Sequence, residues 1–310
     1  MLTALIILVI VGMIWTTTGV VMGGAARHGV RVESMQFMSY LLGGAACLAL
    51  LPLYPSPEVG GKLAWYAFGM YFVVGVLNYF INIAMAAAMK CGPNSLVWAI
   101  LQTGMIVPFV IGICFHGEQA GFVRLLGMAA MLAALALISL DKDKGSHAEG
   151  GGAKGKSWLF IAFAAFLMVG VQQAVNTEPS YNPAIRTGIP TIYRCLMLFG
   201  GNLVAALPYM LTLAGRGGVK AVLDEFSGKW IWIFAIALQA SLLIDKLFLS
   251  FRAMDMMARL GRGGVSYPVM VVSCIAGFTL YSITILHEKV TWHSAIGLML
   301  SALGIVMISL

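Results

Sequence analysis

The stretch HGEQAGFVRLLGMAAMLAALALISL, residues 116–140, recurs in altered form as HEKVTWHSAIGLMLSALGIVMISL, residues 287–310. At a shift of 170 positions, a glutamate and the glycine nine residues after it coincide in the two copies. These matching residues are Glu118 and Gly127 in the first copy, and Glu288 and Gly297 in the second. An internal repeat constrains the architecture more strongly than any single motif does. The sequence therefore predicts a fold built from two related halves.

The composition is typical of a membrane protein. Charged residues make up 10% of the chain, apolar residues make up 60%, and the mean hydropathy is +0.92. A soluble domain carries about 25% charged residues, and a membrane-spanning helix needs roughly 20 mostly apolar ones. Stretches of this kind occur at residues 3–23, 35–54, 64–89, 95–115, 121–140, 157–176, 190–213, 230–258, 264–286 and 292–310. We therefore predict an all-α integral membrane protein with ten transmembrane helices.

A Gly- and Lys-rich linker divides these helices into two sets. Residues 1–140 are predicted to form the first five-helix repeat, residues 141–156 the flexible linker, and residues 157–310 the second repeat. Because five is an odd number and the connections are short, the second half enters the membrane in the opposite orientation. The sequence therefore predicts a 5+5 repeat of inverted topology. A second linker is expected at residues 214–229.

A longer pattern occurs once in each half. A small-residue helix end is followed by a basic residue, a Gly- or Pro-containing turn, a helix, and then the Glu and Gly-rich helix. It reads AAAMKCGPNSLVWAI (86–100) to GEQAGFVRLLG (117–127), and again MMARLGRGGVSYPVM (256–270) to HEKVTWHSAIG (287–297). This pattern resembles the ten-helix drug/metabolite transporter superfamily, of the EamA-like kind. The resemblance spans essentially the whole chain, and the one departure is His287 where the first copy has Gly117.

The resemblance implies a transporter with an inverted repeat and both termini in the cytoplasm. It also implies a central cavity lined mainly by helices three, four, eight and nine. Loop charges point the other way for the termini, because Lys and Arg gather in the loops that the resemblance would place outside. The absolute orientation therefore stays open, as does the substrate, because members of the family carry amino acids, sugars, nucleotide sugars and drugs.

The eighth helix carries the most informative charges. Asp245 and Lys246 are adjacent near the midpoint of residues 230–258, where a charge costs about 2.5–3.5 kcal/mol on insertion scales. Asp245 and Arg252 recur at a seven-residue interval and form part of a polar stripe. We predict that Lys246 binds substrate and that Asp245 and Arg252 couple an ion. A structural ion pair that locks helices together is the alternative.

Polar and aromatic groups of three other helices are further candidates for substrate binding. Asn78 and Asn82 lie four residues apart in helix three, so both amides share one face. Trp98 and Gln102 lie in helix four, and Tyr267, the repeat partner of Trp98, lies in helix nine. The alternative for the amides is hydrogen bonding between helices, and for the aromatic rings it is space filling.

Four residues are predicted to have structural or gating roles. Pro108 and Pro268 interrupt helices four and nine, where they could form hinges or ordinary kinks. Glu118 and Glu288 lie at helix junctions, where we expect them to cap or gate helices five and ten. The five cysteines show no CxxC spacing, so buried thiols are expected and neither a metal site nor a cofactor is.

Three classes of function compete on the sequence. A secondary transporter is favoured because the nucleotide-binding motif GxxxxGK[ST] does not occur, so that energy would come from gradients. An intramembrane enzyme is disfavoured because HExxH and GxSxG do not occur. A receptor or scaffold would not explain a repeat with charges at mid-span. We predict a multi-pass protein of the inner (plasma) membrane, monomeric or homodimeric, without nucleic-acid partners. It would move a small polar metabolite, such as an amino acid, or a sugar together with a proton.

Overall fold

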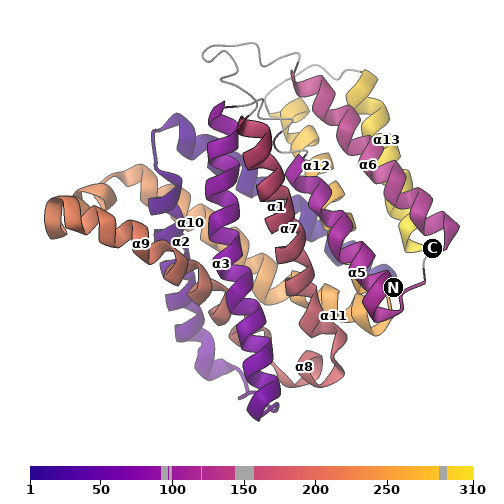
Figure 1. The fold of residues 1–310 in the computed structure, drawn as a ribbon, viewed down its shortest axis with the longest axis horizontal. Helices are drawn as coiled ribbons and strands as arrows, with labels where there is room; N and C mark the ends of the chain where they lie inside the picture. The colour runs from indigo at the N-terminus through magenta and orange to yellow at the C-terminus, as the bar shows by residue number, and fades with distance from the viewer. Residues whose placement is uncertain (92–96, 98–99, 120, 144–156, 286–291) are drawn as a thin grey trace. The chain divides into compact units, whose positions relative to one another are not determined.

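The computed structural model describes residues 1–91, 97, 100–119, 121–143, 157–285 and 292–310. In these residues every regular element is helical (Figure 1). The helices of the first half are α1 (Leu2–Arg27), α2 (Val32–Leu50), α3 (Gly61–Cys91), α5 (Ile106–His116) and α6 (Phe122–Asp143). Those of the second half are α7 (Ser157–Tyr181), α8 (Pro183–Gly188), α9 (Thr191–Phe226), α10 (Lys229–Leu243), α11 (Phe251–Arg259), α12 (Ser266–Thr284) and α13 (Trp292–Ser309). The all-α fold class is confirmed.

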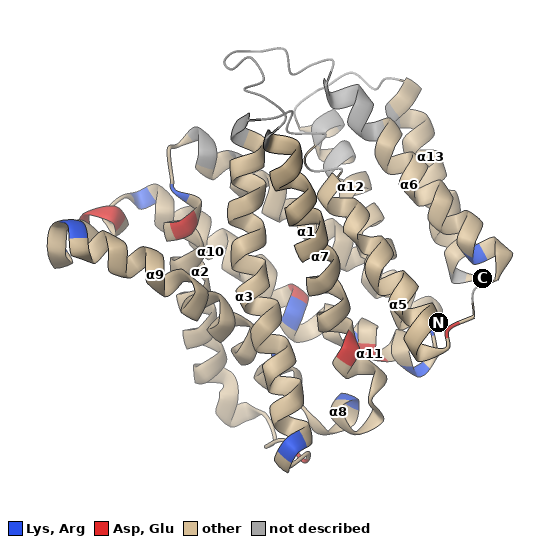
Figure 2. Cartoon of the chain, viewed as in Figure 1, with Lys and Arg blue, Asp and Glu red and all other residues tan. Residues whose placement is uncertain are grey.

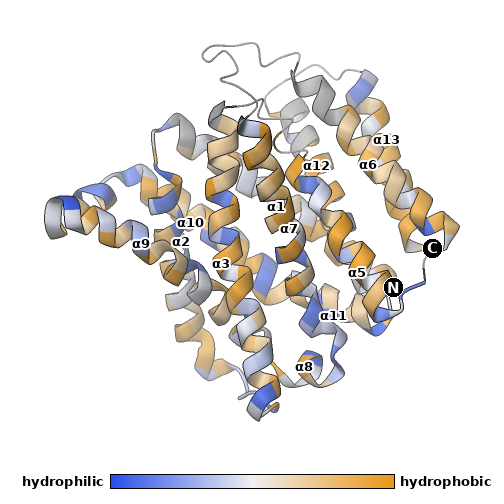
Figure 3. Ribbon diagram, viewed as in Figure 1, coloured by the Kyte–Doolittle hydropathy of each residue, from blue (hydrophilic) through white to orange (hydrophobic). Residues whose placement is uncertain are grey.

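Six of the helical segments are long and apolar enough to cross a membrane, namely Leu2–Met22, Val32–Leu53, Gly61–Met89, Trp158–Tyr181, Thr191–Phe226 and Lys229–Arg259. Shorter apolar helices lie at Ile100–His116, Phe122–Leu137, Gly263–Gly277 and Ala295–Ile308, within or beside the other predicted spans. Figure 3 shows hydrophobic residues along much of the length of these helices. The chain is therefore a multi-pass membrane protein, as its hydropathy predicts.

The chain forms two compact units. Unit 1 comprises Met1–Thr16, Ala84–Thr177 and Ala253–Leu310, and unit 2 comprises Thr17–Ile83 and Glu178–Arg252. Each unit draws on residues of both predicted halves, so neither unit coincides with residues 1–140 or 157–310. The division of the chain into two halves and a linker therefore stays a prediction.

In unit 2, α9 packs against two helices of the first half. It runs antiparallel to α2, because Ser34 contacts Tyr209 whereas the later Tyr40 contacts the earlier Phe199. It runs parallel to α3, and here the two backbones meet directly. A Cβ atom added to Gly75 would collide with the carbonyl oxygen of Leu198, and one added to Gly201 would collide with the backbone of α3. Small residues at such crossings are how membrane helices approach each other closely.

In unit 1, helices α6 and α13 lie side by side (Figure 1). A Cβ atom on Gly127 would lie 2.7 Å from the backbone nitrogen of Ile308, and one on Gly304 would lie 2.7 Å from the Met131 side chain. As α6 advances from residue 127 to residue 131, its contacts on α13 move back toward Gly304. The two helices are therefore antiparallel.

The structure differs from the sequence prediction in two connections. Residues 214–229 were expected to form a linker, but α9 continues to Phe226 with a kink at Gly217 and Gly218. Gly218 has a φ angle of 66°, which a glycine adopts without strain. Between α7 and α9 the chain forms the short helix α8, which Asn182 caps by accepting a hydrogen bond from the Ala184 N–H.

Candidate functional site

The eighth span is not a uniform α-helix. Between α10 and α11, residues Ile244–Ser250 form a π-helical segment, here called η3. This segment contains Asp245 and Lys246, whose carboxylate and ammonium groups form an ion pair of 3.0 Å. The Asp245 side chain is fully buried, and the Lys246 side chain is 12% exposed. π-Helical turns are rare and occur often at functional sites. Asp245 and Lys246, predicted to couple an ion and to bind substrate, thus lie in an irregular turn, with Asp245 fully buried and Lys246 largely so.

Phe251, the residue that follows the π-helical segment, contacts an aromatic ring and a cation within unit 2. The Phe251 ring lies 5.2 Å from the Tyr71 ring, and the Arg194 guanidinium lies 5.8 Å from each ring centre. Arg194 also donates hydrogen bonds to the carbonyl oxygens of Ile185, Arg186 and Ile189. Arg194 therefore stabilises the end of α8. Arg252, predicted to couple an ion with Asp245, has an exposed side chain.

Asn78 and Asn82 belong to a cluster of amide and hydroxyl groups within unit 2, here called the amide cluster. The Asn78 amide donates to the Tyr40 hydroxyl at 2.6 Å and to the Asn202 carbonyl oxygen at 3.3 Å. The Asn82 amide donates to the Gln36 carbonyl oxygen at 3.0 Å. Both asparagines therefore connect α3 to neighbouring helices. In the described part of the chain, the Gln36 amide nitrogen has no hydrogen-bond partner, although it is buried.

Tyr267 belongs to a second polar cluster, which lies in unit 1. Its hydroxyl accepts a hydrogen bond of 2.6 Å from the Asn176 amide of α7, and its ring lies 6.1 Å from the Trp15 ring. The carbonyl oxygens of Asn176 and Gln173 are buried and have no partner among the described residues. Buried polar atoms are usually hydrogen-bonded, so these two oxygen atoms are candidates for binding a ligand or a water molecule. Gln102, in the same unit, is partly exposed.

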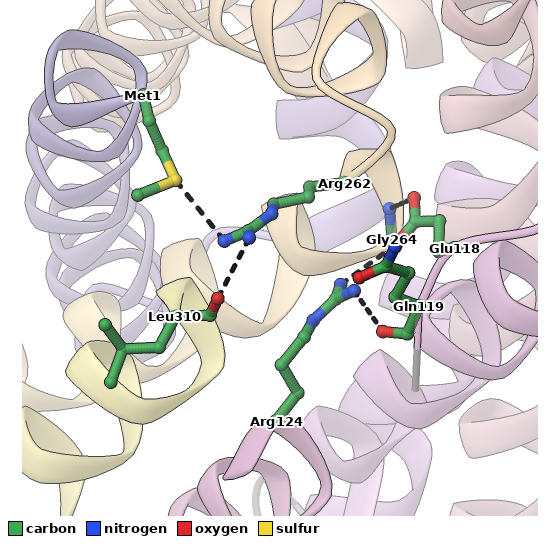
Figure 4. A network of polar contacts seen from close by, with 7 residues as sticks. All are labelled: Met1, Glu118, Gln119, Arg124, Arg262, Gly264 and Leu310. Atoms are coloured by element: carbon green, nitrogen blue, oxygen red, sulfur yellow. Dashed lines mark hydrogen bonds and ion pairs between the residues drawn. The ribbon is translucent and has the colours of Figure 1, made fainter. Parts of the chain in front are cut away.

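Glu118 lies in a network that connects three parts of unit 1 (Figure 4). Its carboxylate accepts a 2.8 Å hydrogen bond from the Gly264 backbone N–H and a 3.1 Å one from Arg124, which also binds the Gln119 carbonyl oxygen. A Cβ atom on Gly112 would lie only 2.9 Å from the carboxyl carbon, so this network is tightly enclosed. The sequence predicted a cap or gate at the start of α6. In the structure the carboxylate binds the backbone at the 3₁₀ turn (Gly263–Val265) that precedes α12, and its gating role stays a prediction.

The two prolines occupy equivalent places in their helices. Pro108 is the third residue of α5 and follows a 3₁₀ turn at Thr103–Met105. Pro268 is the third residue of α12, which also follows a 3₁₀ turn. A proline in the first helical turn removes no intrahelical hydrogen bond. Pro268 therefore lies near the start of a helix and does not interrupt one. Trp98 and Glu288 lie outside the described residues.

Charged residues lie mainly toward the ends of the helices, and few lie within them (Figure 2). Among the described residues, no group of three or more His, Cys, Asp or Glu side chains is placed to hold a metal ion. Sequence reasoning had not selected Gln36, Tyr40 and Asn202 of the amide cluster. Gln36 and Tyr40 are polar residues four positions apart in an apolar helix, which is the signal that selected Asn78 and Asn82.

Comparison with known proteins supports the membrane assignment. Residues 2–140 match the EamA-like transporter family. A solved structure described as "Crystal structure of protein" matches with a TM-score of 0.69 and 16% sequence identity, over 99% of this chain and 98% of that one. At this identity the likeness shows the fold. The search of curated proteins finds no match. The first of the two predicted halves therefore matches the EamA-like transporter family, and the repeated motifs and the multi-pass helical fold agree with the drug/metabolite transporter superfamily that the sequence resembles.

Proposed function

We propose that this protein is a secondary transporter that moves a small polar metabolite, such as an amino acid, across the inner membrane by alternating access. The observation that carries the proposal is the buried Asp245–Lys246 pair in the π-helical turn of a membrane span. Burying two charges at such a depth costs several kcal/mol. Charges retained there line substrate or ion pathways in most membrane proteins that have them.

The architecture that we propose is ten transmembrane helices in two five-helix halves of inverted topology. Two antiparallel helix pairs support it, because α2 with α9 and α6 with α13 are corresponding helices of the two halves. The boundaries between the compact units give independent support. The chain passes from unit 2 to unit 1 after Ile83 and again after Arg252. These two positions are 169 residues apart, which agrees within one residue with the repeat shift of 170.

The chemistry of the polar groups suggests the class of substrate. Lys246 offers a positive charge to a carboxylate, and the amide cluster and the Asn176–Tyr267 pair offer neutral hydrogen-bonding groups. A zwitterion such as an amino acid would use both kinds of group. In this scheme the substrate carboxylate displaces Asp245 from Lys246. The released Asp245 carboxylate then takes a proton from one side of the membrane and releases it on the other side. The proton therefore moves in the same direction as the substrate or in the opposite direction.

The amide cluster also favours a second candidate, the transport of a neutral sugar with a proton. Gln36, Tyr40, Asn78, Asn82 and Asn202 supply amide and hydroxyl groups of the kind that bind sugar hydroxyls. In this case Lys246 would serve as the counter-ion of Asp245, and its charge would not be needed for affinity.

Uptake into proteoliposomes tests both candidates. Purified protein would be reconstituted, and radiolabelled amino acids and sugars would be supplied with and without an imposed pH gradient. We expect uptake of an amino acid that depends on the protein, is lost in Lys246→Met, and is retained in Lys220→Gln, which removes an exposed cation near the end of α9. Sugar uptake that survives Lys246→Met would support the second candidate. Failure to move any solute of either class would contradict the proposal.

A further inference from the structure

A pocket of about 320 Å³ lies between the start of α2 and the outer part of α9, within unit 2. It is lined by Arg31, Pro208, Tyr209, Thr212, Leu213 and Arg216. The lining thus holds two guanidinium groups, two hydroxyl groups and no carboxylate. We propose that this pocket binds the phosphate headgroup of an anionic phospholipid at the membrane surface.

The position of the pocket along α9 fits the depth of a lipid headgroup. α9 has 36 residues and would be about 54 Å long if straight, whereas the hydrocarbon core is about 30 Å thick. After the buried Arg194 near its start, the next charged residue of α9 is Arg216, immediately before the kink at Gly217 and Gly218. The apolar part of α9 therefore leads to a charged end, which carries residues of both signs and of which Arg216 is the first (Figure 2).

Neighbouring aromatic residues support the same depth. Trp230 and Trp232, at the start of α10, are 37% and 40% exposed. The indole N–H of Trp232 donates to the Phe226 carbonyl oxygen at 2.8 Å, which fixes this ring beside the end of α9. The Lys229 ammonium lies 5.3 Å from the centre of the Trp230 ring. Tryptophan with a nearby cation is typical of the membrane–water interface.

One face of α9 offers space for the acyl chains below this pocket. Val204, Leu207 and Leu211 are 50%, 45% and 70% exposed, and their spacing of three and four residues gives an apolar stripe. Pro208, Thr212 and Arg216 follow at four-residue intervals, so one face of the helix carries the pocket. A phospholipid whose chains lie on this stripe would bring its phosphate to Arg216 and Arg31.

Contacts with α9 hold Arg31 beside the pocket and keep it charged. Its guanidinium donates to the Tyr209 hydroxyl at 3.4 Å and forms a 3.4 Å ion pair with Glu225. The hydrogen bond to Tyr209 and the charge of Glu225 raise the pKa of Arg31 above its usual value. Its side chain is still 59% exposed, so it remains available to a ligand. Glu225 itself is held by a hydrogen bond from Ser34.

Native mass spectrometry of the delipidated full chain tests the assignment. The protein would be titrated with phosphatidylglycerol and with phosphatidylcholine of the same acyl chains, with and without excess inorganic phosphate. We expect the anionic lipid to bind more tightly. Each arginine should contribute about fivefold to its affinity, so Arg31→Gln/Arg216→Gln should lower it about 30-fold. Arg216→Gln, at an exposed position, gives the fivefold loss without disturbing the Arg31–Glu225 pair.

Lys220→Gln is the matched control, because it removes an exposed cation from the same end of α9 without touching the pocket. Its affinity for phosphatidylglycerol should stay within about twofold of the wild type. An equal loss in Lys220→Gln and Arg216→Gln would overturn the proposal in favour of diffuse surface charge. Equal binding of the two lipids would overturn it too. Displacement of the lipid by inorganic phosphate at similar concentration would instead assign the pocket to free anions.

Discussion

Among the described residues, two buried ion pairs are of almost equal length, and each compact unit contains one of them. Glu118 and Arg124 in unit 1 are 3.1 Å apart, and Asp245 and Lys246 in unit 2 are 3.0 Å apart. Both carboxylates are fully buried. The pairs differ in what they join. Glu118 and Arg124 are six residues apart and bind the backbone of two further positions, whereas Asp245 and Lys246 are neighbours in one helix.

This difference separates a structural role from a functional one. The carboxylate of Glu118 binds both Gly264, in the turn before α12, and Arg124, at the start of α6. Its hydrogen bonds therefore join three segments of unit 1, which offsets the cost of burying the charge. An ion pair between adjacent residues joins no separate segments through its own contact. In the function that we propose, Asp245 and Lys246 are retained for what they bind or transfer, in spite of the cost of burying both charges.

Removing the Glu118 charge should have the largest effect on stability. Glu118→Gln leaves the Arg124 cation buried without its counter-ion, which costs about 3–5 kcal/mol. Thermal or chemical unfolding in detergent would measure this loss. Glu58→Gln, at an exposed position, is the control and should change stability by about 0.5 kcal/mol or less. An equally small effect of Glu118→Gln would mean that the network in Figure 4 does not stabilise unit 1.

Replacing both members of each pair by neutral residues should sharpen the contrast. Asp245→Asn/Lys246→Met should leave stability within about 1 kcal/mol of the wild type, because neutral replacement of a buried pair is often tolerated, and should abolish transport. Glu118→Leu/Arg124→Leu should remain destabilised by about 1–3 kcal/mol or more, because the Gly264 N–H and the Gln119 carbonyl oxygen lose their partners. The comparison would fail if the two double variants lost equal stability.

Asp245→Asn by itself should separate coupling from binding. The amide keeps the shape of the side chain but cannot exchange a proton, so accumulation driven by a pH gradient should disappear while counterflow exchange of substrate continues. Both rates would be measured in the same proteoliposomes. Accumulation at the wild-type level would mean that Asp245 is only the counter-ion of Lys246. The loss of stability should be smaller than that of Glu118→Gln, because the Lys246 side chain is 12% exposed and its ammonium group can be hydrated.

Hydropathy predicts the helices well because lipid requires long apolar stretches. The span predicted at residues 157–176 is the helix Ser157–Tyr181, and the one at 3–23 is Leu2–Arg27. The π-helical turn at Ile244–Ser250 was not predictable, because its sequence IDKLFLS has no proline or glycine to mark an irregularity. Residues 214–229 are charged and were predicted to form a linker, but α9 continues to Phe226 beyond the kink at Gly217 and Gly218.

The polar clusters show a second limit of sequence reasoning. The two asparagines of α3 were identified from their spacing, which is a local signal. Their partners are 46 residues away at Gln36 and 124 residues away at Asn202, and a single sequence carries no information on such pairings. The ion pair of Asp245 and Lys246 could be predicted because both residues are adjacent. The network of Glu118 with Gly264 could not, since a backbone N–H has no signature in the sequence.

The smallest predicted effects concern the asparagines of the amide cluster. A hydrogen bond between membrane helices contributes about 0.6 kcal/mol on average, so Asn82→Ala, which removes the bond to Gln36, should lower stability by about that amount. Asn78→Ala removes bonds to Tyr40 and Asn202 and should cost about twice as much. Unfolding would measure these losses, and uptake kinetics would be recorded on the same variants. If the cluster only joins helices, the KM for substrate stays constant while stability falls. If the amide cluster binds the substrate, the KM rises in Asn82→Ala by more than so small a loss of stability can explain. That result would mean that the substrate contacts the amide cluster as well as the ammonium group of Lys246.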